Sequence, residues 1–445
     1  MTNVTIIGAG LAGSLLAIYL ARRGYQVTVF EARADMRKET VAAGRSINLA
    51  LSDRGIAALR EVGMDEYMLA EAVPMKGRMI HSGTGETKLL PYSGREGEYI
   101  NSVSRSGLNI ALMNEAEKYA NVRLIFNERC SDFDVSSGEV SFESGRTMRS
   151  DTVIATDGAG SPVRQAMQRQ IADFQFSSVF LDHGYKELHI PPGEGGQPKF
   201  AIEPNALHIW PRHKFMMIAL PNFDGSFTCT LFLAHEWKGE AGFDGLATER
   251  DVREFFEAEF PDAVPLMPTL IGDFFGNPTG QLGTVKCWPW AAGGKVLLLG
   301  DSAHAVVPFY GQGMNCAFED VRVLDGLIEK HGTDWTAVYE EYGKLRKINT
   351  DAIADLAEEN FYEMRDATAD PVFQRKRAVE TRLEQEFPDY YSKYSMVTFR
   401  EDLPYSVARE RGNAQDRRLM EICAAVDDVS MLDLNAVREE LKTIR

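Results

Sequence analysis

Three glycines and one acid near the start of the chain have the types and spacing to bind a nucleotide. Gly8, Gly10 and Gly13 directly follow the apolar run 4–7. In this spacing the first glycine permits a tight turn, the second lets the backbone approach a pyrophosphate, and the third lets a helix pack close to a strand. Glu31 ends the next apolar run, where a carboxylate can accept hydrogen bonds from a ribose diol. The segment therefore predicts a strand–turn–helix unit with the phosphates of a dinucleotide at the positive end of the helix.

Two further acids stand where apolar runs end. Asp157 and Gly158 follow one such run, and Gly300 and Asp301 follow another. A carboxylate at the tip of a buried strand can accept a hydrogen bond from a ligand hydroxyl. Each motif alone is equally typical of a helix cap or a turn. The glycine turn and these two motifs together are more specific for a nucleotide site than any one of them.

In this order the three motifs resemble those of the FAD-dependent aromatic hydroxylases, the class A flavoprotein monooxygenases, in which all three contact FAD. Longer irregular stretches, such as 74–82, 99–105 and 360–365, are similar to the kynurenine 3-monooxygenase branch of that family. The similarity extends from the start of the chain to about Phe399. It implies that FAD is bound by Gly8, Gly10, Leu11, Ala12 and Gly13, by Glu31 and Arg33 at the adenosine ribose, by Arg105 at the diphosphate or ribitol, by Asp157, and by Asp301, Gly311, Gln312, Gly313, Met314 and Asn315 toward the ribityl chain and the flavin ring.

The glycine-rich loop after Asp301 belongs to this implied FAD site. Gly311 and Gly313 flank a position where the backbone can approach a flat ring. The helix that begins there would direct its positive end toward a reduced flavin and stabilise negative charge on it. The alternative is a purely structural glycine-rich connection.

The resemblance also implies a site for an amino-acid substrate. Arg78 and Tyr92 match the pair that binds the carboxylate in the family, since an arginine can donate two parallel hydrogen bonds and a phenol a third. Asn360 and Tyr394 match a pair supplied by the C-terminal helices. The alternative for Arg78 is a surface salt bridge of little energetic worth. The implied apolar wall around the substrate ring comprises Leu207, Ile218, Leu220, Phe232 and Phe309, all of which could equally be core residues.

The chemistry that the resemblance implies is ring hydroxylation. NADPH, a transient co-substrate, would reduce bound FAD, and O2 would then hydroxylate L-kynurenine to 3-hydroxy-L-kynurenine through a flavin hydroperoxide. The aromatic amine already activates the ring, so no catalytic base is assigned, and no metal is expected. His304 and His81 are better interpreted as a helix-start and a packed histidine. The single glycine fingerprint leaves no second Rossmann unit for NADPH, which favours transient docking in a surface groove.

The elements that must position these residues form an α/β fold. We expect a Rossmann-like FAD-binding domain that is split in sequence, an inserted antiparallel β-sheet that forms the substrate domain, and a C-terminal helical region. The expected domains are 1–176 as the first part of the FAD-binding domain, with strands around 77–103 contributing to the substrate site, 177–290 as the inserted sheet, 291–333 as the return segment, and 334–445 as the helical region.

Composition excludes several classes of protein. The 445 residues can form two or three domains with sizeable cores. A net charge of −17 argues against nucleic-acid binding and against docking on anionic membranes. Five cysteines without a C-x-x-C pair support neither a disulfide framework, nor a zinc site, nor a redox dithiol, and they suit a reducing cytoplasm.

The two ends of the chain predict where the protein works. The first strand begins almost at once, which leaves no room for a signal peptide. The resemblance implies a C-terminal membrane anchor in eukaryotic relatives, whereas the stretch 432–442 is too charged and too short to span a bilayer. We therefore expect a soluble, cytoplasmic enzyme of the bacterial type. A homodimer is compatible with the sequence.

Three other functions remain open from the sequence. The first is an aromatic hydroxylase for a phenol or a salicylate, against which Arg78, Tyr92 and Asn360 favour an amino-acid substrate. The second is an FAD oxidase or dehydrogenase without oxygen transfer, against which the hydroxylase-like stretch 309–315 argues. The third is a non-catalytic FAD-binding module whose charged C-terminal helices contact a partner.

Overall fold

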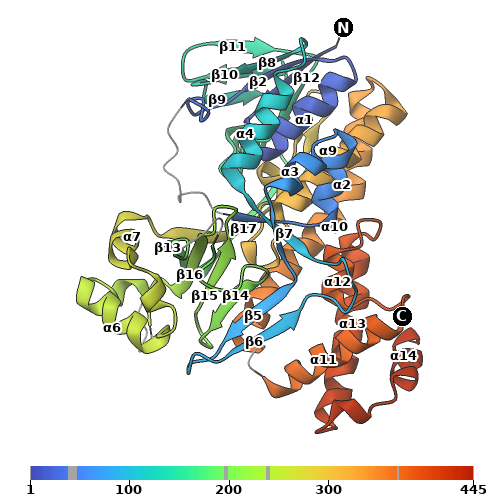
Figure 1. Ribbon diagram of the computed structural model, residues 1–445. Coiled ribbons are helices and arrows are strands. Elements are labelled where there is room, and N and C mark those ends of the chain that lie inside the picture. The colour runs from blue at the N-terminus through green and yellow to red at the C-terminus, as the bar shows by residue number, and fades with distance from the viewer. Residues whose placement is uncertain (1, 39–47, 195–198, 237–240, 368–369, 444–445) are drawn as a thin grey trace.

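The computed structural model describes residues 2–38, 48–194, 199–236, 241–367 and 370–443. It shows a nucleotide-binding half, an antiparallel sheet beside it, and a group of C-terminal helices on the far side of that sheet (Figure 1). The predicted fold class is confirmed, because a largely parallel sheet is interrupted in sequence by an inserted antiparallel one.

A six-stranded sheet forms the centre of the nucleotide-binding half. Its strands are β1 (Asn3–Ile7), β2 (Gln26–Phe30), β8 (Val122–Ile125), β12 (Thr152–Ala155), β18 (Ala291–Ala292) and β19 (Val296–Leu298). The order is β18-β19-β12-β1-β2-β8. Among the described strands of this sheet, only the β18–β19 pair is antiparallel. β12 and β19 are buried throughout, as expected for central parallel strands covered on both faces. The pairing of β19 with β12 closes the split domain.

Helices complete this half. They are α1 (Leu11–Arg22), α2 (Asp53–Glu61), α3 (Asp65–Ala70), α4 (Arg105–Ala116), α5 (Pro162–Gln170), the short α8 (Asp301–His304) and α9 (Gly313–His331). The start of α5 follows from its sequence, because Pro162 takes the first helical position and the Ser161 hydroxyl accepts from the Arg164 N–H at 3.0 Å. The first turns of α10 (Trp335–Tyr362) also pack here through Trp335 and Tyr339.

Two three-stranded sheets flank the central one. The first contains β3 (Asn48–Leu51), β4 (Val73–Met75) and β7 (Ile100–Ser104), and the second contains β9 (Cys130–Asp134), β10 (Glu139–Phe142) and β11 (Thr147–Arg149). The first sheet lies between the nucleotide-binding half and the antiparallel sheet (Figure 1).

The antiparallel sheet has seven strands in the order β17-β13-β16-β15-β14-β5-β6. They are β5 (Gly77–His81), β6 (Thr87–Pro91), β13 (Gln175–Ile190), β14 (Leu207–Pro211), β15 (Met216–Pro221), β16 (Phe227–Ala234) and β17 (Gly280–Trp288). β5 joins the inserted strands by pairing parallel with β14, which sets Arg78 opposite Leu207. One face is covered by α6 (Glu249–Glu259) and α7 (Leu270–Gly276), with the short η1 (Phe243–Gly245) and η2 (Val264–Leu266).

The C-terminal region is helical, as predicted. After α10 and the π-helical turn η4 (Glu363–Ala367) come α11 (Pro371–Glu386), α12 (Lys393–Thr398), α13 (Tyr405–Ala424), η5 (Val429–Met431) and α14 (Leu434–Lys442). These helices lie beside β5 and β6, far from the central sheet (Figure 1). Within the described ranges, no helix has the length and apolar character needed to cross a membrane.

Candidate active site

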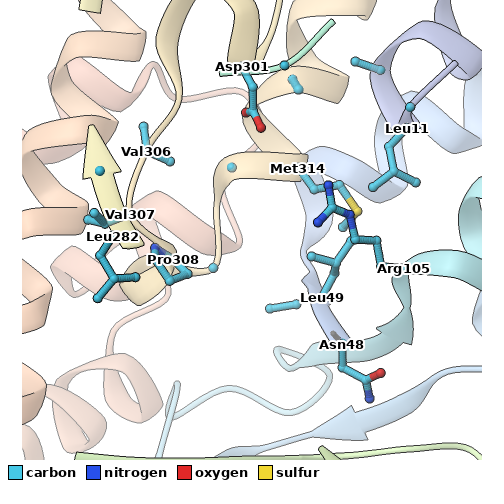
Figure 2. Close-up of a pocket in the computed structure, with 18 of the residues that line it drawn as sticks. Leu11, Asn48, Leu49, Arg105, Leu282, Asp301, Val306, Val307, Pro308 and Met314 are labelled. Atoms are coloured by element: carbon cyan, nitrogen blue, oxygen red, sulfur yellow. The ribbon is translucent and has the colours of Figure 1, made fainter. Parts of the chain in front are cut away.

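A cavity of about 720 Å³ lies where the central sheet, the antiparallel sheet and α12 meet. Figure 2 shows Leu11, Arg105 and Met314 on one side of this space, with Leu282 and Pro308 across from them. The sequence-predicted residues that line it are Gly8, Gly10, Leu11, Ala12, Glu31, Arg33, Arg78, Tyr92, Arg105, Asp157, Leu207, Ile218, Leu220, Phe232, Asp301, Phe309, Gly311, Gly313, Met314 and Tyr394. One continuous space therefore contains both the glycine turn and Arg78.

The glycine turn can accommodate only glycine at two of its positions. Gly8 has a φ of +102°, and a Cβ there would lie 2.6 Å from the carbonyl oxygen of Thr156. A Cβ on Gly13 would lie 2.0 Å from the Gly8 oxygen, so Gly13 serves the packing of α1 on the sheet and does not line the cavity. Gly10 precedes α1 without a side-chain cap, and the first turn of α1 carries no acid. The backbone N–H groups of that turn are therefore available to an anion.

Glu31 lies at the end of β2, beside the turn. Its Oε2 accepts from the Ala9 N–H at 2.9 Å, and its Oε1 accepts from Nε of Arg33 at 2.7 Å. Burial alone would raise the pKa of Glu31, but the hydrogen bonds from Arg33 and Ala9 outweigh it and hold the pKa below its usual value. Glu31 is therefore an anion with remaining acceptor capacity toward the cavity, which suits a ribose diol.

Asp157 presents an unpartnered carboxylate to the cavity. Both of its oxygens are buried, and neither has a hydrogen-bond partner among the described residues. Burial raises the pKa of Asp157 to about 6, and the nearby Ser161 hydroxyl and the start of α5 offset only part of that effect. A buried acid without donors is costly. Hydroxyl groups of a ligand would supply those donors.

Asp301 is an exposed residue whose carboxylate is open to the cavity (Figure 2). Desolvation by the surrounding protein raises its pKa, while His304 and Arg105 favour the ionised form. The acid stands at the start of α8, directly after Gly300, whose φ of +65° turns the chain at the end of β19. Arg105 begins α4 and lines the opposite side, where a guanidinium can bind a phosphate.

These features fit a dinucleotide that carries a polyol. The glycine turn and the uncapped α1 suit a diphosphate, Glu31 suits a ribose, and the unpartnered Asp157 and the open Asp301 suit hydroxyl donors. The arrangement therefore fits FAD, whose ribityl chain provides such hydroxyls.

Arg78 lies on β5 at the other end of the cavity and is 8% exposed. Its Nη1 donates to Oε1 of Glu363 and its Nη2 donates to Oδ1 of Asn360, both at 3.4 Å. Its Nε is buried without a partner among the described residues. Burial works to lower the pKa of Arg78, but Tyr394, Glu363 and Tyr92 raise it above its usual value, so the group stays cationic. Two long hydrogen bonds leave this cation under-bonded, because charge-assisted bonds are normally about 2.7–2.9 Å.

Two tyrosines lie beside this guanidinium. The rings of Tyr92 and Tyr394 stack with centroids 4.8 Å apart, and the Arg78 guanidinium is 5.1 Å from the Tyr394 ring centroid. The Tyr92 hydroxyl is buried and has no hydrogen-bond partner in the described part of the chain. Burial raises the pKa of Tyr92 well above its ordinary value, so its phenol remains a donor. Arg78 and Tyr92 thus both line the cavity and both carry a donor without a partner among the described residues, as a carboxylate site requires.

An apolar wall separates the two polar ends. Leu207 and the alternate residues Ile218 and Leu220 come from β14 and β15. Phe232 on β16 contacts Phe309 with ring centroids 4.9 Å apart. The alternation follows from the sheet, because every second residue of a strand faces the same side.

Three predicted residues support the cavity without lining it. Oδ1 of Asn315 accepts from the Ser52 N–H at 2.9 Å, and Nδ2 of Asn315 donates to the Ala50 carbonyl at 2.8 Å. Oε1 of Gln312 accepts from the Tyr405 hydroxyl at 3.0 Å. Asn360 accepts from Arg78 and donates to the Phe309 carbonyl at 2.6 Å. Their side chains are therefore engaged with protein, although all three are predicted from the sequence to contact a ligand.

The structure also brings unanticipated residues to the site. Asn48 and Leu49 of β3 line it, as do Tyr185 and Met364. Tyr310 extends the tyrosine stack, with its centroid 5.6 Å from that of Tyr394. No periodicity or spacing in the sequence distinguishes these residues from core residues. A further unanticipated residue, Glu363, contacts Arg78 from behind the cavity wall.

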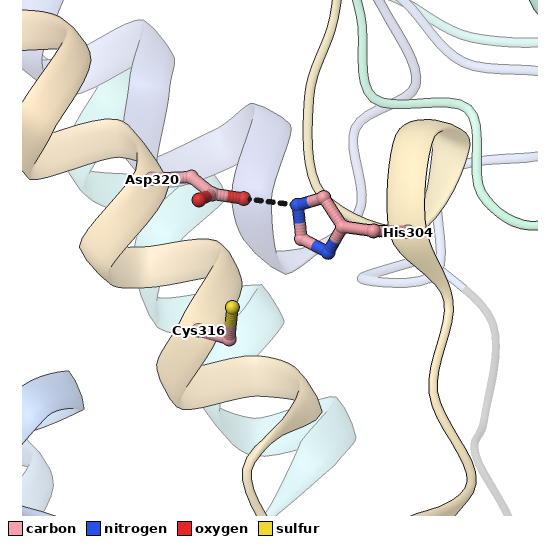
Figure 3. Close-up of side chains that lie close together, drawn as sticks. All are labelled: His304, Cys316 and Asp320. Atoms are coloured by element: carbon pink, nitrogen blue, oxygen red, sulfur yellow. Dashed lines mark hydrogen bonds and ion pairs between the residues drawn. The ribbon is translucent and has the colours of Figure 1, made fainter. Parts of the chain in front are cut away.

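A buried cluster of His304, Cys316 and Asp320 lies beside the cavity, and its geometry is that of three metal ligands (Figure 3). However, Nε2 of His304 is already bonded to Asp320 at 2.6 Å, and Arg346 donates to the other Asp320 oxygen at 2.6 Å. Burial also raises the pKa of Cys316 well above its ordinary value, which keeps the thiol protonated. The cluster therefore acts as an ion pair that joins α8 to α9 and α10.

Comparison with known proteins extends over nearly the whole chain. The FAD binding domain family matches residues 1–190 and 282–342. Kynurenine 3-monooxygenase from Myxococcus xanthus is 48% identical over 447 residues, covering 99% of this chain and 95% of the relative. Kynurenine 3-monooxygenase from Dictyostelium discoideum is 44% identical over 448 residues, covering 98% of this chain and 96% of the relative.

Solved structures share the fold at lower identity. The tetrameric form of 2-methyl-3-hydroxypyridine-5-carboxylic acid oxygenase has a TM-score of 0.67 and 20% identity, covering 88% of this chain and 99% of the other. PqsL of P. aeruginosa in complex with 2-aminobenzoylacetate has a TM-score of 0.64 and 19% identity, covering 82% of this chain and 99% of the other. At such identities the likeness concerns the fold alone.

Proposed function

The chain belongs to the kynurenine 3-monooxygenase family of FAD-binding proteins, and from this premise we propose that it hydroxylates L-kynurenine to 3-hydroxy-L-kynurenine. The observation that carries the proposal is the under-bonded Arg78 in the wall of the same cavity that the glycine turn lines. A hydroxylase for a simple phenol would have no carboxylate to place on a buried guanidinium. An amino-acid substrate needs one.

The substrate carboxylate would bind to Arg78 and Tyr92. Nε of Arg78 and the Tyr92 hydroxyl are both buried without partners among the described residues, and each can donate to a carboxylate oxygen. Asn360 would hold the guanidinium from behind, and Tyr394 would cover it through its stacked ring. Binding would thus satisfy donors that otherwise remain buried at a cost.

The apolar wall would orient the aromatic ring. Leu207, Ile218, Leu220, Phe232 and Phe309 offer flat and aliphatic surfaces between the carboxylate end and the flavin end. When bound, FAD supplies the redox chemistry, taking electrons from a reduced nicotinamide and passing one oxygen atom of O2 to the ring. The wall would hold the ring in reach of that oxygen, since a displacement of about 1 Å can cost a hundredfold in rate. It would also exclude water from the reacting atoms.

No side chain in this site is assigned as a base. Burial raises the pKa values of Tyr92, Tyr310 and Tyr394, so these phenols stay protonated at neutral pH and do not act as bases. The aromatic amine of the substrate supplies electron density to the ring carbon next to it. The protein therefore needs to position the ring, and needs no group to deprotonate it.

We further propose NADPH as the electron donor, bound transiently. The sequence carries one glycine fingerprint, and the cavity at that turn suits FAD. The nicotinamide nucleotide would then dock without a Rossmann unit of its own.

The test is a purification followed by a single assay series. The purified protein should be yellow, should oxidise NADPH faster when L-kynurenine is added, and should yield 3-hydroxy-L-kynurenine by mass spectrometry. Hydrogen peroxide as the sole product with every amino acid tried would indicate an oxidase. Turnover of salicylates in place of kynurenine would indicate a different hydroxylase. Bound FAD without any NADPH oxidation would indicate a non-catalytic module.

A further inference from the structure

A network of buried and partly buried charges runs from Arg78 into the C-terminal helices. Oε1 of Glu363 accepts from Arg78 at 3.4 Å, and its Oε2 lies 3.8 Å from Nζ of Lys393. Lys393 in turn lies 2.6 Å from Asp416, which also accepts from Lys376 at 2.8 Å. These groups come from β5, η4, α12, α13 and α11, so the network links the strand that carries Arg78 to four segments of the C-terminal region.

Glu363 is the group in this charge network that can compete with a substrate carboxylate for Arg78. It is a resident carboxylate against the same guanidinium that a substrate carboxylate would use. Two anions on one buried cation repel each other, unless a second cation takes part of the charge of one of them. Glu363 is not among the residues that line the cavity, so it acts on Arg78 from behind.

Lys393 is placed to be that second cation. Burial raises the pKa of Glu363, but the nearby cations lower it below its usual value, and Lys393 contributes more to this than Lys376 or Arg78. Lys393 is itself fixed by its short contact with Asp416. If Lys393 were replaced by a neutral residue, Asp416 would still pair with Lys376 and Glu363 would still pair with Arg78. Neither anion of the network would lose its last cation.

We propose that Lys393 is a positioning residue for the substrate site: by sharing Glu363 with Arg78, it keeps that carboxylate from closing on the guanidinium and leaves Arg78 free for the substrate carboxylate. Without Lys393, Arg78 would be the one described cation within 4 Å of Glu363, with Lys376 acting from farther away, and Glu363 would contract onto Arg78. The inference rests on the proposed function, because it assumes that an amino-acid carboxylate is the ligand of Arg78.

The test is a set of substrate dissociation constants measured on the FAD-loaded enzyme without NADPH. Binding is followed by the change in flavin absorbance as L-kynurenine is added. The Lys393→Met variant should bind at least about tenfold more weakly, as expected when a buried carboxylate loses one of two cations. Lys393→Arg should stay close to the parent enzyme because it keeps the charge. The double variant Lys393→Met/Glu363→Gln should recover to within about threefold of Glu363→Gln alone, since the competing anion is gone.

A matched control removes Lys286, a lysine whose acidic partner lies on α10, the helix that leads into Glu363. Lys286 on β17 contacts Asp355 at 2.6 Å and touches neither Glu363 nor Arg78 in the described structure. Lys286→Met should leave the dissociation constant unchanged, even if it lowers the thermal stability. This separates a loss of substrate affinity from a loss of rigidity in α10.

The outcomes distinguish the inference from the function on which it rests. Unchanged binding by Lys393→Met, or a double variant that binds as poorly as Lys393→Met, overturns the role of Lys393 alone. A parent enzyme that does not bind L-kynurenine overturns the proposed function, and the inference with it. If Lys393→Met does not retain FAD, Glu363→Gln is decisive by itself: equal or tighter binding supports the competition, and weaker binding overturns it.

Discussion

The nucleotide end and the carboxylate end of the cavity are built in different ways. At the nucleotide end, backbone groups and neighbours in sequence do the work, from the turn at Gly8 to the Glu31–Arg33 pair. At the carboxylate end, Arg78 meets Asn360 and Glu363 across more than 280 positions of sequence. The glycine turn and the ribose acid of the first end are encoded locally, whereas the contacts of Arg78 at the second exist only once the whole chain has folded.

Glu31 at the nucleotide end and Arg78 at the carboxylate end differ in how well their polar atoms are satisfied, although Asp157 at the nucleotide end is also without a partner among the described residues. The Glu31 carboxylate already accepts three hydrogen bonds, from Ala9 and Arg33, of 2.7–3.0 Å. Arg78 has only two bonds of 3.4 Å, and Nε of Arg78 and the Tyr92 hydroxyl have no partner among the described residues. The difference teaches that the carboxylate end is preorganised for a ligand, because unused donors that are buried stabilise the protein only when a ligand accepts from them.

The largest effect is expected from a substitution that disturbs the backbone at the nucleotide end. In Gly13→Ala the new Cβ would lie 2.0 Å from the Gly8 oxygen and 2.5 Å from Oγ1 of Thr156. We expect the free energy of unfolding to fall by about 3 kcal/mol and the purified protein to lose its FAD. Denaturant unfolding and the ratio of flavin to protein absorbance measure both effects.

A matched glycine provides the control for that substitution. A Cβ on Gly160 would meet no heavy atom within 4 Å, and its φ is not in the left-handed region. Gly160→Ala should therefore retain both stability and FAD. If Gly13→Ala behaved like Gly160→Ala, the nucleotide end would not depend on close packing of α1 against the sheet.

The next largest effect is expected at the other end, and it should leave FAD in place. Arg78→Met removes the guanidinium but keeps most of the apolar volume. We expect the dissociation constant for L-kynurenine to rise about 30-fold or more, since a buried charge pair is lost. Arg78→Lys should have a dissociation constant between those of the parent and Arg78→Met, because a lysine keeps the charge but cannot donate in a bidentate manner. Titration of the flavin absorbance measures the affinity, and loss of FAD from either variant would contradict the independence of the two ends.

The difference between the ends also explains what the sequence could predict. Gly8, Gly10, Gly13 and Glu31 could be placed because their roles depend on spacing within one strand–turn–helix unit. The α/β fold and its interruption by an antiparallel sheet also followed from local patterns of hydrophobicity and turns. Arg78 could be assigned a role only through resemblance, since nothing in its neighbourhood distinguishes it from an arginine on an exposed strand.

What could not be predicted depends on contacts between distant segments. Gln312 and Asn315 belong to the loop that was expected to contact FAD, yet Tyr405 and Ser52 turn their side chains into the protein. The Glu363–Lys393 contact joins two helices whose charged residues, read from sequence, would be assigned to solvent-facing surfaces. Only the packing of α12 and the π-helical turn against β5 brings these groups together.

A third, smaller effect concerns pH and separates the FAD-free protein from the loaded one. The pKa of Asp157 is about 6 in the folded FAD-free protein, against an ordinary value of 3.8. Between these values the folded state binds the extra proton, so its stability should decrease as pH rises from about 4 to 6, by roughly 2 kcal/mol in total. Asp157→Asn should remove this decrease, because the amide does not titrate.

The measurement for Asp157 is denaturant unfolding of the FAD-free protein across that pH range. The parent and the Asp157→Asn variant should converge near pH 4 and diverge by pH 7, with the variant more stable. Saturating FAD should reduce the difference, since hydroxyl donors from the ligand would favour the carboxylate. Parallel curves for the two proteins would show that the acid is already satisfied without a ligand.

The smallest expected effect is the sharpest test of the unused donors at the carboxylate end. The Tyr92 hydroxyl has no hydrogen-bond partner among the described residues, and Tyr92→Phe keeps the ring that stacks on Tyr394, so the unfolding temperature should stay unchanged or rise slightly. The same variant should bind L-kynurenine about three- to tenfold more weakly, the usual worth of one hydrogen bond. A hydroxyl that served the fold would show the opposite pattern, with a lower unfolding temperature and unchanged affinity. Because stability and affinity are expected to respond independently, this one substitution decides whether the donor next to Arg78 is kept for a ligand or for the protein.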